Sequence, residues 1–206
     1  MANLLIKKTG KIAVVTVNRP EQMNSINSKT RLELANAFTD LGKDSGISVI
    51  ILTGAPGKAF IAGADIKEFL ERDMSSQEVL EKDWIVTKII SNLSKPVIVM
   101  IDGFCLGGGL EIAMACDLRI ASDRSKLGQP EINLGIIPGA GGTQRLTRLI
   151  GEGRAMEMIL TGRMITAKEA CNYGILNFIY SAEELETKTM EIANTIADKS
   201  PYAIER

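Results

Sequence analysis

Three segments of the chain share one form, in which an apolar strand leads through a loop of small residues into a helix. They span residues 52–66, 101–111 and 128–145. The strands that enter the first two segments, "ISVIILTG" (47–54) and "KPVIVMIDG" (95–103), are almost continuously apolar. That pattern is typical of parallel strands that are covered on both faces. Because strands and helices alternate along the chain, the sequence predicts an α/β fold with parallel strand pairing.

Hydrophobic periodicity and cap signals predict the remaining elements. Strands are predicted at 3–8, 11–17, 118–122 and 176–180, and helices from Asn27 or Ser28, from the capping box Ser75-Ser76-Gln77-Glu78 to about Leu93, at 143–150 and 152–161, from Thr166 to about Gly174, and from Ser181 to about Asp198. We expect one core domain over residues 1–200. Residues 201–206 have the pattern of the first turn of a further helix. Since one turn is not stable alone, we expect the natural protein to continue beyond them.

The composition is that of an ordinary globular protein and argues against two classes of partner. A net charge of -1, from 24 basic and 25 acidic residues without a basic stripe, predicts no nucleic-acid partner. The apolar runs are too short to span a bilayer, so we expect no membrane partner. The first residues lack the pattern of a signal or transit peptide, and we expect a cytoplasmic location. Cys105, Cys116 and Cys171 form no CxxC motif and are interpreted as reduced thiols.

The chain contains no histidine, and this absence limits the chemistry available to it. Ser-His-Asp and Cys-His catalysis and metal sites built on imidazole are therefore excluded. An enzyme of this composition working near neutral pH must take its acid and base from carboxylates, Lys, Tyr or Cys. A carboxylate needs a raised pKa to serve there as an acid, and burial raises it.

Glu111 is the most unusual ionisable residue, because it lies in "GFCLGGGLEIAMACD" (103–117), where its neighbours are apolar on every side. A helix that is apolar all round is a buried helix. A buried carboxylate must be paired, hydrogen-bonded or neutral. A glutamate in a first turn can also simply complement the helix dipole, which contributes about 0.3–1 kcal/mol. That role requires no burial, so the surroundings favour a chemical role for Glu111.

Glu131 follows Pro130 in "GQPEINLG" (128–135). Taken alone, a proline followed by a glutamate is an ordinary helix start. Two glutamates, each beside a glycine-rich loop in a chain without histidine, also make a suitable acid/base pair. The combination favours Glu111 and Glu131 as catalytic residues. Asp65 is interpreted as a helix cap rather than a catalytic group.

The small-residue loops suit a ligand that approaches the backbone closely. Free N–H groups at helix starts favour negative charge, which suggests a phosphate site or an oxyanion hole. The stretch "GAPGKAF" (54–60) is not a P-loop, and "GAGGTQR" (139–145) lacks the last glycine of a GxGxxG motif. An oxyanion hole requires only two converging N–H groups, which "AGAD" (62–65) and "LGGG" (106–109) can provide. Plain turns and tight helix–strand contacts are the alternative interpretation of these glycines.

Three stretches together resemble the signature motifs of the crotonase (enoyl-CoA hydratase/isomerase) superfamily. They are "FIAGADIKEF" (60–69), "KPVIVMIDGFCLGGGLEIAMACDLRIAS" (95–122) and "GQPEINLGIIPGAGGTQRL" (128–146). The likeness runs from about residue 4 to the end and looks closest to the bacterial short-chain enoyl-CoA hydratases, including those acting as 3-hydroxybutyryl-CoA dehydratases. It implies a crotonase-like spiral of ββα units over residues 1–200, a C-terminal helical region that starts at 201–206, and CoA thioester substrates.

The resemblance also implies roles for particular residues. The oxyanion hole falls on the backbone N–H groups of Ala64 and Gly108. The glutamate matching Glu111 helps to activate the water that adds to the substrate's Cβ, and the one matching Glu131 supplies the proton to Cα. The adenine and pantetheine of CoA would run along the first motif. The substrate-binding residues implied in this way are Ala62, Gly63, Ala64, Asp65, Ile66, Lys67 and Gly108.

The implied function is a hydro-lyase of fatty-acid β-oxidation that adds water reversibly to trans-2-enoyl-CoA, without a metal or redox cofactor. Family members carry further C-terminal helices and form homotrimers, often paired into hexamers, which we expect of the full-length protein. The presence of both glutamates favours a hydratase over isomerase-type members. Two alternatives stay open: another crotonase-fold reaction, such as enoyl-CoA isomerisation or hydration of a dienoyl- or cyclic acyl-CoA, and acyl-CoA binding without catalysis.

Overall fold

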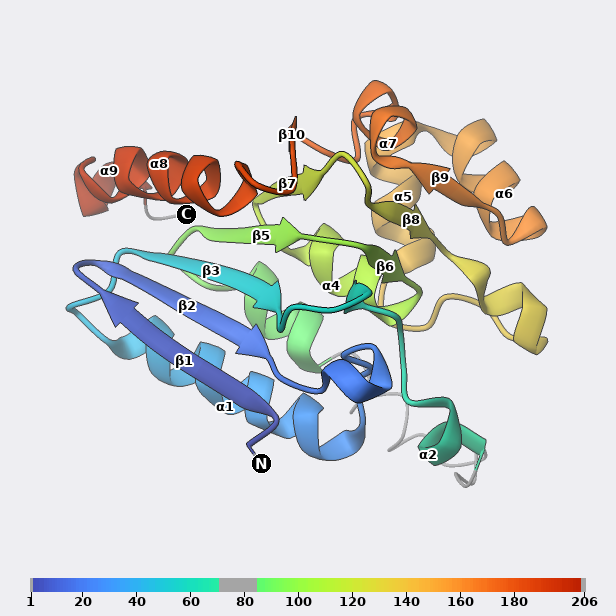
Figure 1. Ribbon diagram of the computed structural model, residues 1–206, viewed down its shortest axis with the longest axis horizontal. Coiled ribbons are helices and arrows are strands. Elements are labelled where there is room, and N and C mark those ends of the chain that lie inside the picture. The colour runs from blue at the N-terminus through green and yellow to red at the C-terminus, as the bar shows by residue number, and fades with distance from the viewer. Residues whose placement is uncertain (1, 71–84, 205–206) are drawn as a thin grey trace.

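The computed structural model describes residues 2–70 and 85–204, and within them the strands form two sheets (Figure 1). A six-stranded sheet has the order β1-β2-β3-β5-β7-β10, and a four-stranded sheet has the order β4-β6-β8-β9. The strands are β1 (Leu4–Thr9), β2 (Ile12–Val17), β3 (Val49–Gly54), β4 (Ala59–Ile61), β5 (Val97–Ile101), β6 (Phe104–Leu106), β7 (Leu118–Ser122), β8 (Lys126–Gly128), β9 (Met164–Thr166) and β10 (Phe178–Tyr180).

From β3 to β8, consecutive strands alternate between the two sheets. β3, β5 and β7 lie in the large sheet, and each is followed along the chain by its partner in the small sheet, β4, β6 or β8. Strands from successive turns pair in parallel within each sheet. The helical elements that follow the pairs are α2 (Ile66–Leu70), α4 (Gly108–Ala115), η2 (Pro130–Leu134) and α5 (Gly142–Ile150). The predicted spiral of ββα units is confirmed.

The remaining helical elements match most of the cap signals in the sequence. They are η1 (Pro20–Gln22), α1 (Ser28–Lys43), α6 (Glu152–Thr161), α7 (Ala167–Tyr173), α8 (Leu185–Ala197), α9 (Pro201–Ile204) and a helical segment at 85–91. Asn27 caps α1, since its side chain accepts from the Thr30 N–H at 2.8 Å. Thr166 and Glu169 form both bonds of a capping box on α7. The predicted capping box at 75–78 lies outside the described residues.

The predicted start of α8 at Ser181 is wrong by a few residues. The Ser181 hydroxyl accepts from the Glu184 N–H at 3.3 Å and donates to the Glu184 carboxylate at 2.9 Å. These bonds close a turn that precedes the helix, and α8 begins at Leu185 with Glu184 as its N-cap. The Ser-x-x-Glu pattern therefore marks the turn rather than the first turn of the helix.

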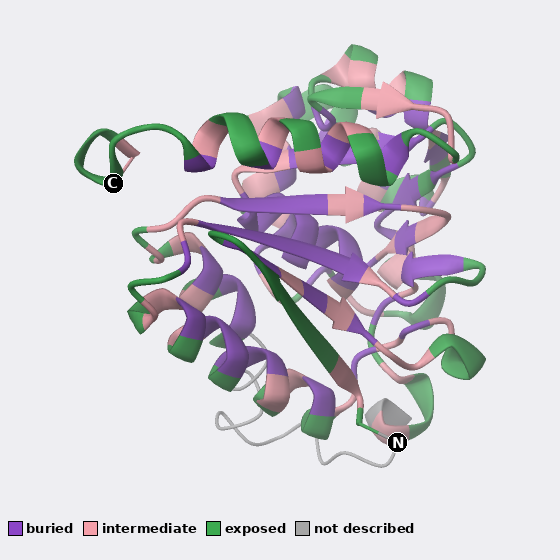
Figure 2. Ribbon diagram, turned by 60° about the vertical axis from the view of Figure 1, so that its left-hand side comes forward, coloured by how far each residue is buried: buried purple, intermediate pink, exposed green. Residues whose placement is uncertain are grey.

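The inner strands β3 and β5 of the large sheet are buried on both faces, as their continuous apolar sequences predict, whereas the edge strand β1 is mostly exposed. α8 packs on one face, over a cluster that contains Ile12, Ile51 and Ile98. α1 and α4 contribute to a second cluster on the opposite face, together with Ile50 and Leu52. Figure 2 shows the inner strands of this sheet almost entirely in the colour of buried residues. The second cluster holds α4, and with it Glu111, in a fixed position.

Candidate active site

Glu111 lies in the first turn of α4, where it is only 3 % exposed and every residue from Gly109 to Ala115 is buried. Its Oε1 atom accepts two backbone hydrogen bonds, from the Ala140 N–H at 2.6 Å and from the Gly142 N–H at 2.7 Å. The sequence required this buried carboxylate to be paired, hydrogen-bonded or neutral, and the structure shows that it is hydrogen-bonded. Two N–H donors favour its ionised form.

The loop that holds Glu111 is the third of the small-residue loops. The sequence suggested that such loops bind a phosphate or an oxyanion. Here the N–H groups of Ala140 and Gly142 are instead occupied by a carboxylate of the chain itself. A side chain at position 142 is excluded, since an ideal Cβ would lie 2.8 Å from Oε1 of Glu111 and 2.7 Å from Cβ of Pro138. This loop therefore fixes Glu111.

Glu131 lies in η2 and faces the glycine-rich loop before α4. An ideal Cβ on Gly107 would lie 3.1 Å from Oε1 of Glu131, so this carboxyl borders the backbone of that loop. Burial raises the pKa of Glu131 to about 7, and the charge of Glu111 adds to the rise. A carboxyl with a pKa near neutral pH can both donate and accept a proton. Glu111 and Glu131 therefore belong to one electrostatically coupled site.

The backbones of Ala64 and Gly108 lie close to each other, next to this pair of glutamates. An ideal Cβ on Gly108 would lie 3.8 Å from the backbone nitrogen of Ala64, which brings the first and second small-residue loops together. Within residues 2–70 and 85–204, neither the Ala64 N–H nor the Gly108 N–H forms a hydrogen bond. Gly108 opens α4, where N–H groups lack partners inside the helix. An oxyanion hole requires two N–H groups that reach one carbonyl oxygen, and its assignment to these two groups stays a prediction.

Backbone hydrogen bonds join the loop at 62–67 to the segment that follows η1. The Ala62 N–H donates to the carbonyl of Met23, and the Asp65 N–H donates to the carbonyl of Ile26. Arg19 forms an ion pair with Asp65 at 2.8 Å. The hydrogen bond from Arg19 lowers the pKa of Asp65 most, and the N–H groups of residues 67 and 68, in the first turn of α2, lower it further. Asp65 is thus the predicted helix cap.

The remaining residues of the predicted binding set line the same loop. Gly63 is buried, whereas Ala64, Ile66 and Lys67 are exposed. Their predicted contacts with CoA stay predictions.

Sequence reasoning missed Gln129, which is fully buried at the end of β8. One terminal atom of its amide lies 2.8 Å from Oε1 and 3.0 Å from Oε2 of Glu131, and an NH₂ group at that place donates to both oxygens. A polar side chain directly after an apolar strand was the available signal. Arg19 was also missed, because 46 residues separate it from Asp65.

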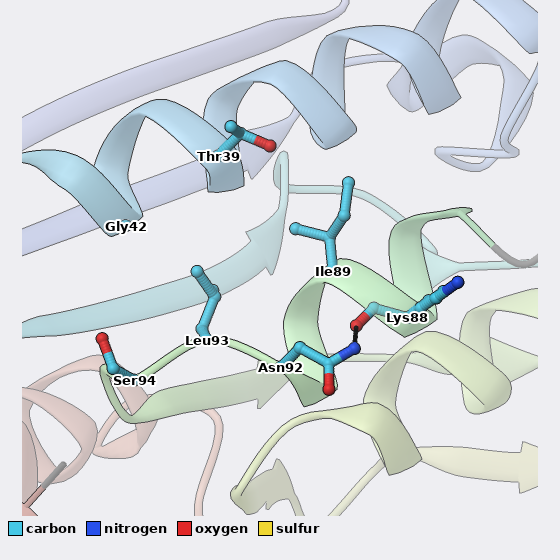
Figure 3. A pocket seen from close by; sticks show the side chains of 7 residues that line it. All are labelled: Thr39, Gly42, Lys88, Ile89, Asn92, Leu93 and Ser94. Carbon is cyan, nitrogen blue, oxygen red and sulfur yellow. Dashed lines mark hydrogen bonds between the residues drawn. The ribbon is translucent and has the colours of Figure 1, made fainter. Parts of the chain in front are cut away.

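Two hollows of the surface lie apart from these groups. One of about 410 Å³ is lined by residues of α1 and of the segment 88–94, none of them a predicted site residue (Figure 3). A second, of about 250 Å³, is bordered by Lys58, Arg124 and Lys126. In the described part of the chain, no cluster of three or more His, Cys, Asp or Glu side chains could hold a metal ion. Within the same residues, no helix has the length and apolar character needed to cross a membrane.

Comparison with known proteins shows which family the chain belongs to. The model of the enoyl-CoA hydratase/isomerase family matches residues 7–206. The chain belongs to the enoyl-CoA hydratase/isomerase family. The superfamily resemblance carried by the three motifs is therefore confirmed.

Relatives within the enoyl-CoA hydratase/isomerase family are similar over nearly the whole chain. The short-chain-enoyl-CoA hydratase of Clostridium acetobutylicum is 45 % identical over 206 residues, which cover 98 % of this chain and 78 % of that protein. The crotonyl-CoA hydratase of Syntrophomonas wolfei is 42 % identical, with the same coverage of each chain. A crystal structure of enoyl-CoA hydratase from Bacillus anthracis has a TM-score of 0.95 at 42 % identity and covers 98 % of this chain and 80 % of that one.

Proposed function

We propose that this chain is an enoyl-CoA hydratase, a hydro-lyase that adds water reversibly to trans-2-enoyl-CoA and gives 3-hydroxyacyl-CoA. One observation carries the proposal. The backbones of Ala64 and Gly108, whose N–H groups form no hydrogen bond within the described residues, lie close to the two coupled glutamates. Membership of the family and the hydratase names of its relatives support the same reaction.

The N–H groups of Ala64 and Gly108 receive the thioester carbonyl oxygen. Their hydrogen bonds withdraw electrons from the conjugated double bond and make Cβ electrophilic. They also stabilise the enolate that forms when the hydroxyl adds to Cβ. In other enzymes, removal of one such donor costs about 2.7–4 kcal/mol of transition-state stabilisation.

The two glutamates divide the proton transfers between them. Glu111, whose ionised form is favoured by the N–H groups of Ala140 and Gly142, takes a proton from water as the water oxygen bonds to Cβ. Glu131, in its acid form, gives its proton to Cα. One proton enters the pair and one leaves it, so water adds across the double bond with no net change in the pair's proton count.

Other features of the proposal concern the substrate and the setting of the enzyme. The adenine and pantetheine of CoA run along residues 62–67, mostly on backbone groups. The reaction as written transfers no electrons, so it requires no redox cofactor, and the two N–H groups perform the polarisation that a metal would otherwise supply. We place the enzyme in the cytoplasm, in fatty-acid β-oxidation, as a homotrimer or hexamer.

The loss of crotonyl-CoA absorbance on hydration tests this function directly. Wild type should consume crotonyl-CoA, while Glu111→Gln and Glu131→Gln should each lower kcat by about 10²–10⁴-fold, because each removes one proton-transfer group. Glu186→Gln, on the exposed side of α8, is the matched control and should keep the wild-type rate. A folded wild type that leaves crotonyl-CoA unchanged, or glutamine variants that keep full activity, would overturn the proposal.

A further inference from the structure

Gln129 is a buried polar residue for which the proposed mechanism has no use. It lies between β8 and η2, has no exposed surface, and is two residues from Glu131 along the chain. One terminal atom of its amide lies 2.8 Å and 3.0 Å from the two carboxylate oxygens of Glu131. A fully buried amide is expected to have hydrogen-bond partners on both of its ends. The partner at this end is the carboxyl whose proton the reaction uses.

The other end of the same amide lies beside Gly142, whose N–H group donates to Glu111. An ideal Cβ on Gly142 would lie 2.8 Å from the second terminal atom of the Gln129 amide and 2.8 Å from Oε1 of Glu111. The Gly142 N–H is one of the two donors that hold Glu111. The Gln129 side chain therefore spans the space between the two glutamates, with one end on Glu131 and the other beside the loop that holds Glu111.

We propose that Gln129 is a positioning residue that keeps the Glu131 carboxyl oriented in both of its protonation states. An amide carries a donor at one end and an acceptor at the other. When Glu131 is ionised, the NH₂ group faces it and donates to both oxygens. When Glu131 is protonated, the NH₂ group still donates to the carbonyl oxygen of the neutral carboxyl, and the amide oxygen stays on the side of the loop that holds Glu111. The inference rests on the proposed role of Glu131 as the acid.

The contact between Gln129 and Glu131 should affect the pKa of Glu131, which can be measured. Burial raises the pKa of Glu131, and among the described residues the charge of Glu111 is the one that raises it further. α6 packs against η2 and carries Glu152, Arg154 and Glu157, which do not contribute to this shift. A donor to the ionised form stabilises that form. Removing the amide should therefore raise the pKa of Glu131 still more.

Gln129→Met tests the inference, because methionine has a similar length and lacks the amide. The carboxyl carbons of Glu131 can be followed by NMR in chain labelled with ¹³C-glutamate, with Glu131→Gln identifying the signal. In Gln129→Met the titration midpoint of Glu131 should rise by about half a unit to one unit. At pH 6 the hydration kcat should fall about tenfold, since the acid is less well oriented, with little change in KM.

Thr53→Val is the matched control, since it removes another buried hydrogen bond, from the Thr53 hydroxyl to the carbonyl of Met100. It should lower the Tm without moving the titration of Glu131. If Gln129→Met leaves the midpoint and kcat unchanged, Gln129 only fills space and the inference is overturned. Because the titration does not depend on turnover, a shifted midpoint in a chain that hydrates no enoyl-CoA would instead count against the proposed function.

A second measurement keeps the inference testable if Gln129→Met does not fold. In wild type, the ¹⁵N side-chain signal of Gln129 should change with pH at the same midpoint as the Glu131 carboxyl. Glu131→Gln should abolish that change. A Gln129 signal that is constant across the titration of Glu131 would overturn the inference.

Discussion

At the scale of single residues, Glu131 lowers the stability of the folded chain near neutral pH. Its pKa is raised from 4.5 to about 7 by burial and by the charge of Glu111. The folded state therefore binds this proton more tightly than the unfolded state does. The contribution to stability is fully present below about pH 4.5 and is lost as the pH rises through about 7. Above that pH, the ionised carboxylate costs on the order of 3 kcal/mol.

Glu131→Gln should remove this cost, because glutamine carries no charge at any pH. We expect the variant to be more stable than wild type by about 1–3 kcal/mol at pH 8 and by under about 1 kcal/mol at pH 5. Urea unfolding at the two pH values measures the difference. Glu186→Gln serves again as the exposed control and should show little dependence on pH. An advantage of Glu131→Gln that is equal at pH 5 and pH 8 would contradict the prediction.

The coupled pair also predicts the pH dependence of the reaction in both directions. Hydration exchanges no proton with the solvent, so its equilibrium constant is independent of pH. The values of kcat/KM for hydration and dehydration must then follow the same curve. Both should fall about tenfold per unit above a midpoint near 7, as the pair loses the proton that Glu131 carries at lower pH. Rates with crotonyl-CoA and 3-hydroxybutyryl-CoA between pH 6 and 9 measure this, and a hydration profile that is flat to pH 9 would rule it out.

The burial of Glu111 could be predicted from sequence, whereas its partners could not. The uninterrupted small and apolar residues on both sides of one carboxylate, from Gly103 to Cys116, indicate burial in any fold. The N–H groups of Ala140 and Gly142 reach Glu111 only because the loop before α5 folds back over α4. No pattern of residue types encodes that loop conformation. The contact between Gln129 and Glu131 is hidden for a related reason, since it depends on the backbone conformation between β8 and η2.

At the scale of elements, α4 packs so closely against β4 that Gly109 has no room for a side chain, whereas its neighbour Gly108 has. An ideal Cβ on Gly109 would lie 2.2 Å from the carbonyl oxygen of Ile61, so Gly109→Ala must push the helix away from the strand. We expect it to lower the free energy of unfolding by about 1–3 kcal/mol or more. Gly153→Ala is the control, because a Cβ there meets no atom within 4 Å and alanine favours the helix α6. Denaturant unfolding should show Gly153→Ala at least as stable as wild type.

Gly108 differs from Gly109 because a methyl group there fits the fold but not the proposed oxyanion site. Its ideal Cβ would lie 3.8 Å from the Ala64 nitrogen and close to no other atom of the described residues. Gly108→Ala should keep a Tm within a few degrees of wild type. Its kcat/KM for hydration should fall at least tenfold, because the methyl group occupies the place of the thioester oxygen. A Gly108→Ala enzyme with normal kcat/KM would show that the carbonyl binds elsewhere.

Elements with local signals were the most predictable. Asn27 and the Thr166 capping box act within one helical turn, so the pattern alone determines them. The start of α8 shows where such a local signal fails. Ser181 and Glu184 form the hydrogen bonds of the pattern in the turn before the helix, so the pattern does not locate the first helical residue. The Arg19–Asp65 ion pair, which fixes the loop at 62–67, could not be predicted, because nothing local to either residue indicates the other.

At the scale of the whole molecule, the alternation of strands between two sheets is what brings the three loops together. The strands of both sheets are apolar, so the sequence does not distinguish β3 from β4 by the sheet that each joins. The α/β class follows from periodicity, and the spiral was predicted only through the resemblance of the three motifs. Each passage from the large to the small sheet leads into one of the three small-residue loops. The site is thus a consequence of the topology.

Several large apolar side chains remain exposed on the face formed by η2, the loop after it and α6. They include Leu134, Leu160 and Ile137, which is 73 % exposed. Large apolar side chains that are exposed close together often mark a surface that contacts another protein. η2 and α6 pack against each other, so these exposed side chains belong to neighbouring elements. This face is where the proposed trimer or hexamer would join its chains.

Light scattering during size-exclusion chromatography of the full-length protein should therefore give three or six times the mass of its single chain. Leu160→Glu should dissociate the assembly, because burying a carboxylate at an apolar contact is unfavourable. Leu32→Glu on α1 is the matched control, since Leu32 is 59 % exposed against 58 % for Leu160 but lies on a different face, and its mass should not change. A wild type that elutes at the mass of one chain would contradict the proposed assembly. Equal dissociation by both variants would show that charge in general, rather than this face, controls the mass.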